Sequence, residues 1–421
     1  MNVWSSIRLL ILSGRDISWT KSVVSWIVYD IANTVFNLGV VGLFLPMWIS
    51  NNPNSTDADL GFSIAISMIV VLVVSPFLGA LTDQIRGRVR TFTFLNIIAV
   101  AATFLIGMGG SIKSGIFFFS VAFICVYLAE LLYNTMLSDA STPKNRGRVG
   151  GIAAAVGNIG SLAIILFALQ HDGINSFVFQ VISIIILFAV LPMAMFFSEK
   201  SSSFLEPRSP VLASTWHQVR TTFRYFQDYP RVSRYFLARY FYMIAITTSS
   251  TFAVLYGINT MKFTEKEVEF VFLIGILVAI PGTVIWGHIV DRLGSFTTLK
   301  VNLLCWMLIL AGSATIPLIG LSNQFWWPLS AFTGFCFGGL WVSDKPLLIE
   351  LSPSNLGHMF GIYGTISRAA FLTGSLLWPL VSVKLGLGQP FAVILLTFCI
   401  VVGLILLISL NSFSEEKLNH N

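Results

Sequence analysis

The chain has 421 residues, of which 55% are hydrophobic and only 10% are charged. A soluble domain carries about 25% charged residues, so the composition excludes a soluble protein. Uncharged runs of the length that crosses a bilayer as a helix recur along the chain, and they lack the period-two alternation of barrel strands. We therefore predict an all-α membrane protein.

Taken in chain order, the uncharged runs predict twelve spans in two sets of six. The first set covers 23–49, 60–82, 91–112, 115–138, 149–170 and 174–197. The second covers 233–259, 268–290, 299–319, 325–349, 357–381 and 388–411. The predicted organisation is a segment 1–22, a bundle 23–197, a linker 198–232, a bundle 233–411 and a tail 412–421.

Basic residues divide unequally between the two sides that twelve spans define. Of 25 Lys and Arg residues, 18 lie on the side of both termini and four on the other side: Lys113, Lys262, Lys266 and Lys384. Because basic loops stay in the cytoplasm, both termini are predicted to be cytoplasmic. The net charge of +6 comes from these loops and indicates contact with anionic lipid headgroups rather than with nucleic acid.

The linker carries apolar residues at helical spacing: Leu212, Trp216, Val219, Phe223 and Phe226. This pattern favours a helix that lies on the cytoplasmic membrane surface, and the alternative is a plain solvated connection. The four cysteines all fall inside predicted spans, so neither a disulfide nor a metal site is expected.

The two sets of spans repeat in sequence. Gly79-Ala-Leu-Thr-Asp83 ends the second span, and Gly287-His-Ile-Val-Asp291 ends the eighth, an offset of 208 residues. Pro143-Lys-Asn145-Arg-Gly147 precedes the fifth span, and Pro353-Ser-Asn355-Leu-Gly357 precedes the eleventh, an offset of 210 residues. Two duplicated six-helix halves are typical of transporters that bind a solute between the halves.

The loop motifs resemble the signature of the major facilitator superfamily. Gly79-x-x-x-Asp83-x-x-x-Gly87-Arg88-x-Arg90 is the first copy, with one residue more than usual between Asp83 and Gly87, and Gly287-x-x-x-Asp291-Arg292-x-Gly294 is the second. Trp26-x-x-Tyr29-Asp30-x-Ala32-Asn33-x-x-Phe36, with Tyr133-Asn134 and Arg146-Gly147-Arg148-Val149, resembles the branch related to the vacuolar amino-acid effluxers of autophagy. The resemblance implies the major facilitator fold, with two pseudo-symmetric six-helix bundles.

The resemblance also implies a gating role for charges at the cytoplasmic ends of the helices. Asp83 would face the start of the eleventh helix near Gly357, and Arg88 would reach Asp139. The second half offers Asp291, Arg292 and Glu350 in comparable places. The alternative is a set of ordinary loop charges that fix topology. Small residues are expected to allow close helix packing at Gly150, Ala153, Gly157 and Ser161, and at Gly357, Gly361 and Gly364.

Charges inside spans are costly and usually face partners or a water-filled cavity. The candidates are Asp30, Glu130, Arg239, Asp344, Lys345 and Arg368. Helical spacing places Asp30 on one face with Trp26, Asn33 and Asn37, and places Glu130 on one face with Tyr127 and Asn134. In the fold that the resemblance implies, helices 1, 4, 7 and 10 line the central cavity, and these helices carry all the candidates except Arg368.

We predict a secondary transporter of a small solute and expect proton coupling. An amino acid or a related zwitterion is the favoured solute, and a peptide, a sugar acid and a drug stay open as alternatives. A carboxyl group in low-dielectric surroundings can take up a proton near neutral pH, so Asp30 and Glu130 are the coupling candidates. Arg239 is expected to pair with one of them or with a substrate carboxylate, and Arg368 with Asp344 or Glu350. The alternative is that these charges only pair with one another and hold the halves together.

Other functional classes find little support in the sequence. Zinc, serine-nucleophile and ATP-binding motifs are missing, so neither an enzyme nor a cofactor is expected. A transporter-like receptor and an efflux pump for larger amphipathic compounds stay open as alternatives. Short loops favour the plasma membrane of a bacterium, and the protein is expected to be a monomer.

Overall fold

The computed structural model describes residues 18–84, 87–142, 145–171, 173–199, 227, 229–352 and 356–418. Within these ranges, the side chains of 80–84, 147, 356–358 and 411–418 lie outside the description. The predicted surface helix, Leu212 to Phe226, lies outside the described residues.

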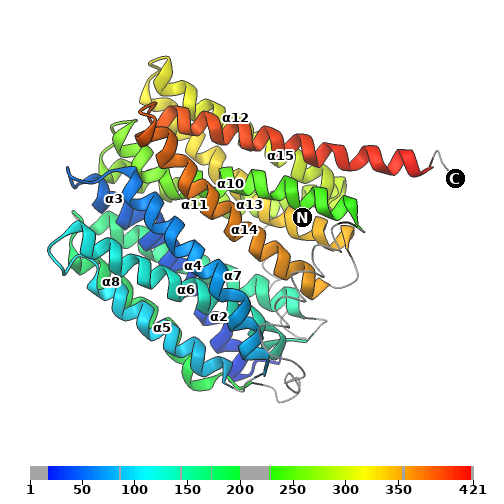
Figure 1. Ribbon diagram of the computed structural model, residues 1–421, viewed down its shortest axis with the longest axis horizontal. Coiled ribbons are helices and arrows are strands. Elements are labelled where there is room, and N and C mark those ends of the chain that lie inside the picture. Colours follow the sequence, from blue (N-terminus) through cyan, green and yellow to red (C-terminus); the bar gives the residue numbers. More distant parts are fainter. Residues whose placement is uncertain are drawn as a thin grey trace. The chain divides into compact units, whose positions relative to one another are not determined.

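Six long helical segments form the first half (Figure 1). The first is continuous from Lys21 to Ser50 and comprises α2 (Lys21–Thr34), the π-helix η2 (Val35–Phe44) and α3 (Leu45–Ser50). The others are α4 (Asp57–Gln84), α5 (Arg88–Leu105), α6 (Ile112–Ala140), α7 (Arg146–Gln170) and α8 (Ser176–Phe196).

Six more segments follow in the second half. They are α10 (Pro230–Asn259), α11 (Glu265–Leu293), α12 (Ser295–Leu318), α13 (Trp326–Leu351) after the short η4 (Asn323–Phe325), α14 (Leu356–Pro379) continued by η5 (Leu380–Lys384), and α15 (Gln389–Leu418). The predicted tail therefore begins inside a helix, because α15 continues past residue 411 to Leu418.

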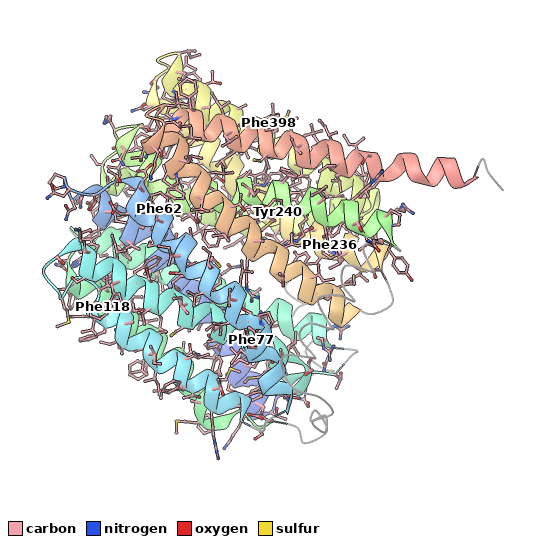
Figure 2. All side chains as sticks on the ribbon, viewed as in Figure 1. Phe62, Phe77, Phe118, Phe236, Tyr240 and Phe398 are labelled. Carbon is pink, nitrogen blue, oxygen red and sulfur yellow. The ribbon has the colours of Figure 1, made fainter. Side chains whose placement is uncertain are left out.

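The lengths and hydropathies of these helices fit a membrane. Among the described residues, 11 helices are long and apolar enough to cross one. The twelfth, α13, has 26 residues and no charge before Asp344, but its tryptophans and glycines lower its mean hydropathy. Large apolar side chains are exposed on many helices, including Phe77 and Phe398, which are labelled in Figure 2. This distribution is the one expected of helices that face lipid.

Local sequence signals explain where the helices begin and end. Thr20 caps α2 through a hydrogen bond from the Val23 amide, and Thr264 forms a capping box with Glu267 at the start of α11. Pro230 stands at the first position of α10, where its missing N–H leaves no bond unmade. Between α11 and α12 the chain turns at Gly294, whose φ of 76° favours glycine.

Helix packing repeats from one half to the other, which confirms the internal duplication. In the first half α2 packs on α8 and α6, and α5 packs on α6 and α8. The matching contacts in the second half are α10 on α15 and α13, and α12 on α13 and α15. These are the same pairs of helices when each half is numbered from its own first span, so the fold is all-α with two pseudo-symmetric sets of six.

The chain forms two compact units, whose bounds do not follow the predicted bundles. The first comprises Met1–Val41, Val73–Phe167 and Ile174–Thr215, and the second comprises Gly42–Leu72, Ala168–Gly173 and Trp216–Asn421, as far as these ranges are described. A division at the linker alone stays a prediction.

Buried polar contacts hold the segment 42–72 within the second unit. Asp57, at the start of α4, is 4% exposed. Its Oδ2 accepts hydrogen bonds from Trp378 Nε1 and Gln389 Nε2, each at 2.7 Å. In the same unit, Lys266 Nζ donates to the carbonyl oxygens of Ala168, Leu169 and His171 at 2.9–3.0 Å. The first half of the chain therefore contributes directly to the packing of the second unit.

Candidate substrate and coupling site

The second unit contains a fully buried ion pair between α10 and α13. Arg239 Nη1 donates to Asp344 Oδ2, and both side chains are 0% exposed. Arg239 Nη2 also donates to Ser367 Oγ on α14 at 2.8 Å. The guanidinium carbon lies 3.4 Å from the centre of the Tyr363 ring. The pair thus connects three helices of the unit.

Three tyrosine hydroxyls donate to the same carboxylate. Those of Tyr235 and Tyr242 reach Asp344 Oδ1 at 2.6 and 2.5 Å, and that of Tyr363 reaches Oδ2 at 2.7 Å. Removing two charges from water costs several kcal/mol per ion, and hydrogen bonds of this number and geometry offset that cost. Asp344 is therefore held by four donors in the interior of the second unit.

The first unit presents a different arrangement around Asp30. Asp30 is half-buried on α2, and its Oδ1 accepts a hydrogen bond from the Tyr133 hydroxyl on α6 at 3.3 Å. Trp26 stacks on the Tyr133 ring, with centroids 4.4 Å apart and planes at 10°, and its Nε1 donates to the Tyr133 carbonyl at 3.0 Å. A Cβ atom at Gly157 of α7 would lie 2.7 Å from Asp30 Oδ2. These contacts fix the position of the carboxylate.

Glu130 and the asparagines extend this polar region. Glu130 is half-buried on α6, and both Glu130 and Asp30 interact electrostatically with Tyr29 and Tyr133. Tyr127 donates to Asn37 Oδ1 at 3.1 Å. In the described part of the chain, Asn33 Oδ1 is buried without a hydrogen-bond partner. Asn134 is exposed. The first unit thus holds two carboxylates among amide and aromatic groups.

The two regions occupy matched places in the repeat. Asp30 and Arg239 are 209 residues apart, whereas Asn134 and Asp344, like Gly157 and Ser367, are 210 apart. Each half therefore brings its first, fourth and fifth helices together around one charged residue. In the second half, Asp344 neutralises the positive charge of Arg239. The first half has the neutral Asn134 at the matched position.

The expected partners of the intramembrane basic residues are partly wrong. Arg239 pairs with Asp344 rather than with Asp30 or Glu130, because α10 and α13 pack side by side in one unit. Arg368 is half-buried, and within the described residues it makes no ion pair with Asp344 or Glu350. Lys345 is exposed, with its ammonium group 5.9 Å from the centre of the Trp341 ring.

The predicted contact between Arg88 and Asp139 is present. Arg88 Nη2 lies 3.3 Å from Asp139 Oδ2, and both side chains are buried. At the matched place of the second half, Ser295 Oγ donates to Glu350 Oε1 at 2.7 Å. Asp291 and Arg292 are exposed at the end of α11, and the Asp83 side chain lies outside the description. The gating role of these residues stays a prediction.

Sequence reasoning missed several residues of these networks. Tyr235 and Tyr242 lie four residues before and three after Arg239, so helical spacing could have placed them beside it. Glu199 accepts hydrogen bonds from the amides of Gly87 and Val89 at 3.3 and 2.7 Å, which satisfies the start of α5. No spacing in the sequence indicates that contact.

The small residues do not all pack as expected. Gly157 does so, because an added Cβ would lie 2.6 Å from Thr34 Oγ1. In the described part of the chain, no neighbouring atom lies within 4 Å of a Cβ added at Gly150, Gly361 or Gly364. The expectation of close packing is wrong at these three positions, where α7 and α14 instead border open space in their own units.

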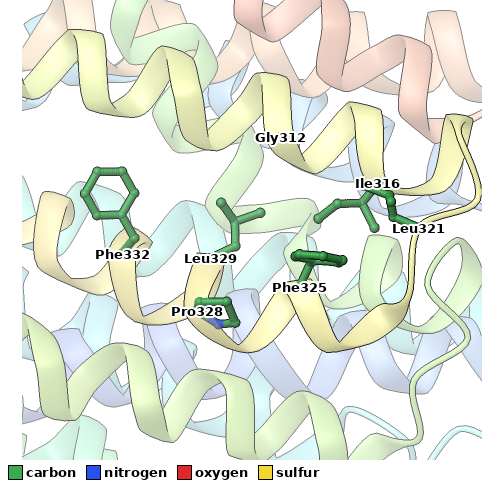
Figure 3. Close-up of a pocket in the computed structure, with 7 residues that line it drawn as sticks. All are labelled: Gly312, Ile316, Leu321, Phe325, Pro328, Leu329 and Phe332. Carbon is green, nitrogen blue, oxygen red and sulfur yellow. The ribbon is translucent and has the colours of Figure 1, made fainter.

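A separate apolar groove lies between α12 and α13 (Figure 3). Its volume is about 420 Å³, and it is lined by Gly312, Ile316, Leu321, Phe325, Pro328, Leu329 and Phe332. None of these lining residues carries a charge or a hydrogen-bonding side chain. The groove therefore contributes nothing to the polar networks of either unit.

Comparison with known proteins agrees with this arrangement of helices. The model of the Major Facilitator Superfamily matches residues 31–375. The chain belongs to this superfamily. Among Major Facilitator Superfamily proteins, it is similar to the uncharacterized MFS-type transporter YxiO of Bacillus subtilis (strain 168), which is 23% identical over 416 residues, covering 92% of this chain and 94% of the relative. An uncharacterized protein of Aquifex aeolicus (strain VF5) is 22% identical over 368 residues, covering 84% and 88%.

Solved structures of Major Facilitator Superfamily transporters share the fold. The nucleoside transporter NupG, solved as a mutant, superposes with a TM-score of 0.72 at 12% identity, covering 92% of this chain and 99% of that one. A bacterial homolog of the human lysosomal transporter Spinster, inward-facing and unoccupied, gives 0.62 at 15% identity, covering 93% and 94%. The likeness to the amino-acid effluxers of autophagy stays a prediction.

Proposed function

We propose that this superfamily member is a secondary transporter that moves an amino acid or a related zwitterion by alternating access, coupled to protons. The observation that carries the proposal is the contrast between Asp30 and Asp344. Asp344 is fully buried beneath four donors, whereas Asp30 is half-buried in a polar region of the first unit. Two intramembrane carboxylates thus have opposite surroundings.

Accessibility to water decides which carboxylate exchanges protons. Protonating Asp344 would remove the charge partner of a buried Arg239 and disrupt three tyrosine hydrogen bonds, which is costly. Asp30 and Glu130 are half-buried, so their carboxylates are nearer to water than that of Asp344. We therefore assign coupling to Asp30 and Glu130, and assign to Arg239 and Asp344 the role of holding α10, α13 and α14 together.

The first unit is suited to the ammonium group of a zwitterion. Asp30 and Glu130 supply negative charge, and both side chains are half-buried rather than enclosed. The same groups would also suit a lipophilic cation, so an efflux pump for amphipathic compounds is the second candidate. A carboxylate requirement of the solute separates the two functions.

Alternating access is supported by the repeat. Duplicated halves bind solute near the midplane and rock around it. Contacts at the helix ends, such as that between Arg88 and Asp139, are of the kind that form in one state and break in another. We further propose that the protein acts as a monomer in a bacterial plasma membrane with both termini in the cytoplasm.

The first test measures thermal stabilisation of the purified protein by the twenty proteinogenic amino acids, by small metabolites and by tetraphenylphosphonium, at two pH values. A ligand that binds only the native state raises its unfolding temperature. Hits are then followed by uptake into proteoliposomes with and without an imposed pH gradient. Full pH-driven uptake in both Asp30→Asn and Glu130→Gln would reject the assigned coupling residues. A stable protein that neither binds nor transports any panel member would reject the proposed function.

A further inference from the structure

We propose that Arg368, rather than Arg239, binds the carboxylate of the transported solute; this inference rests on the proposed function. Arg368 lies twelve residues after Leu356, the first residue of α14, and the helical segment continues to Lys384. At 1.5 Å per residue it is roughly 18 Å from the helix start, near the centre of a bilayer core about 30 Å thick. Solute sites of such transporters lie near this depth.

Arg239 is not available for this contact. Its Nη1 is bound to Asp344 and its Nη2 to Ser367, its guanidinium covers the Tyr363 ring, and its side chain is 0% exposed. A solute carboxylate would have to displace Asp344 and enter a core without solvent access. The charge of Arg239 is already balanced inside the unit.

Arg368 has the opposite surroundings. It is half-buried, and the part of the chain that the structure describes provides it with no hydrogen bond or ion pair. Asp344 is held by Arg239, and Glu350 accepts a hydrogen bond from Ser295. A mid-span cation without a protein partner is expected to face a water-filled cavity.

The face of α14 that carries Arg368 supports this placement. Gly361, Thr365 and Arg368 share one face, since steps of four and three residues return to the same side of a helix. Gly361 and Thr365 are exposed, and a Cβ added at Gly361 would meet no described atom within 4 Å. Further along, the same face carries Leu372 and then Leu376, which is 39% exposed. Arg368 therefore stands at the inner end of the polar part of this face.

The repeat supplies a second, independent observation. Asn158 of α7 is 210 residues before Arg368 and likewise lies twelve residues after the first residue of its helix, Arg146. Asn158 is exposed, as are Gly151 and Ala155 on the same face. Both matched helices thus present a hydrogen-bonding side chain at one depth on an open face, and only the second half adds a positive charge.

The charge of Arg368 suits the carboxylate of a zwitterion. In the second half, Arg368 is a mid-span cation that Asp344 does not neutralise. A guanidinium can bind a carboxylate through two parallel N–H···O bonds, which lysine cannot reproduce. Arg368 would thereby select solutes that carry a carboxylate.

The experiment compares each transported amino acid with its decarboxylated amine as competitors for uptake into proteoliposomes. For the native protein we expect the amino acid to bind about 10- to 100-fold more tightly than the amine, the range of a charged hydrogen bond. Arg368→Gln should remove this difference by weakening the amino acid alone, and Arg368→Lys should restore only part of it. The unfolding temperature of Arg368→Gln should stay native, whereas Arg239→Gln should lower it.

Other outcomes overturn the inference and leave the proposed function standing. An undiminished difference in Arg368→Gln would do so. Equal binding of amino acid and amine by the native protein would overturn the inference and would also favour the efflux pump over the zwitterion transporter. A ligand-free test uses Arg368→Cys with the four native cysteines replaced. Failure of a membrane-impermeant thiol reagent to label it would mean that water does not reach the position and would overturn the inference. Absence of uptake of every panel member by the native protein would instead overturn the proposed function, and the inference with it.

Discussion

Arg239 and Asp344 are 105 residues apart in sequence and form an ion pair to which solvent has no access. Three tyrosine hydroxyls donate to Asp344, and Arg239 also donates to Ser367. The stability of the fold depends on such a pair mainly in the sense that removing one member is costly, because the remaining charge is then buried alone.

We therefore expect Arg239→Gln and Asp344→Asn each to destabilise the protein by about 3–5 kcal/mol. The double variant should be less destabilised than the sum of the two, since neither charge remains uncompensated. Thermal unfolding in detergent measures both effects. Native unfolding temperatures in the single variants would contradict a structural role of the pair.

Gly157 offers a test of how tightly Asp30 is positioned. An added Cβ would lie 2.6 Å from Thr34 Oγ1 and 2.7 Å from Asp30 Oδ2, so Gly157→Ala should displace the carboxylate and reduce transport. Gly150→Ala is the matched control in the same helix, because its Cβ meets nothing within 4 Å. The control should retain transport and gain up to about 1 kcal/mol from helix propensity. Equal transport by both variants would show that the Asp30 position tolerates displacement.

Asp30→Asn should retain the fold and lose the dependence of uptake on an imposed pH gradient. The amide keeps the size of the side chain and its capacity to accept from Tyr133, but it cannot exchange a proton. Solute-driven uptake and pH-driven uptake measured in the same proteoliposomes separate binding from coupling. Asp30→Glu is the control that keeps the ionisable group.

The contact between Arg88 and Asp139 should bias the balance between transport states. Arg88→Gln removes the positive partner, and we expect it to change the rate of uptake more than the affinity for solute. Exchange of the two residues, Arg88→Asp with Asp139→Arg, should recover part of the native rate. A purely topological role predicts no recovery and an altered orientation of the loops.

Hydropathy was sufficient to predict the spans, because each span is a local property of about 20 residues. The duplicated architecture followed from loop motifs that recur at a nearly constant offset. The contact of Arg88 with Asp139 followed from the motif. The partner of Arg239 inside the membrane could not be predicted from the sequence, because the choice among partners depends on which helices pack together. Asp344 lies on one of the helices expected to line the cavity, but the sequence around it does not favour it over Asp30 or Glu130 as the partner of Arg239.

Packing of small residues was similarly beyond a single sequence. Gly157 and Gly150 belong to one glycine-rich helix, yet only Gly157 meets a neighbour. A glycine in the sequence indicates that a neighbouring helix can approach closely. It does not indicate whether a helix packs there. The same ambiguity concealed the open face that carries Arg368.

The hydrogen bonds of Asp57 have a consequence for biosynthesis. Trp378 and Gln389, its donors, follow it by 321 and 332 residues. At ribosomal rates of about 5–20 residues per second, these two residues are synthesised roughly 15–65 s after Asp57. Until α14 is complete and α15 begins, the Asp57 carboxylate at the start of α4 must be solvated by water or by the insertion machinery. A chain that ends before Trp378 lacks both donors and keeps a carboxylate at the start of α4 without the partners that bury it.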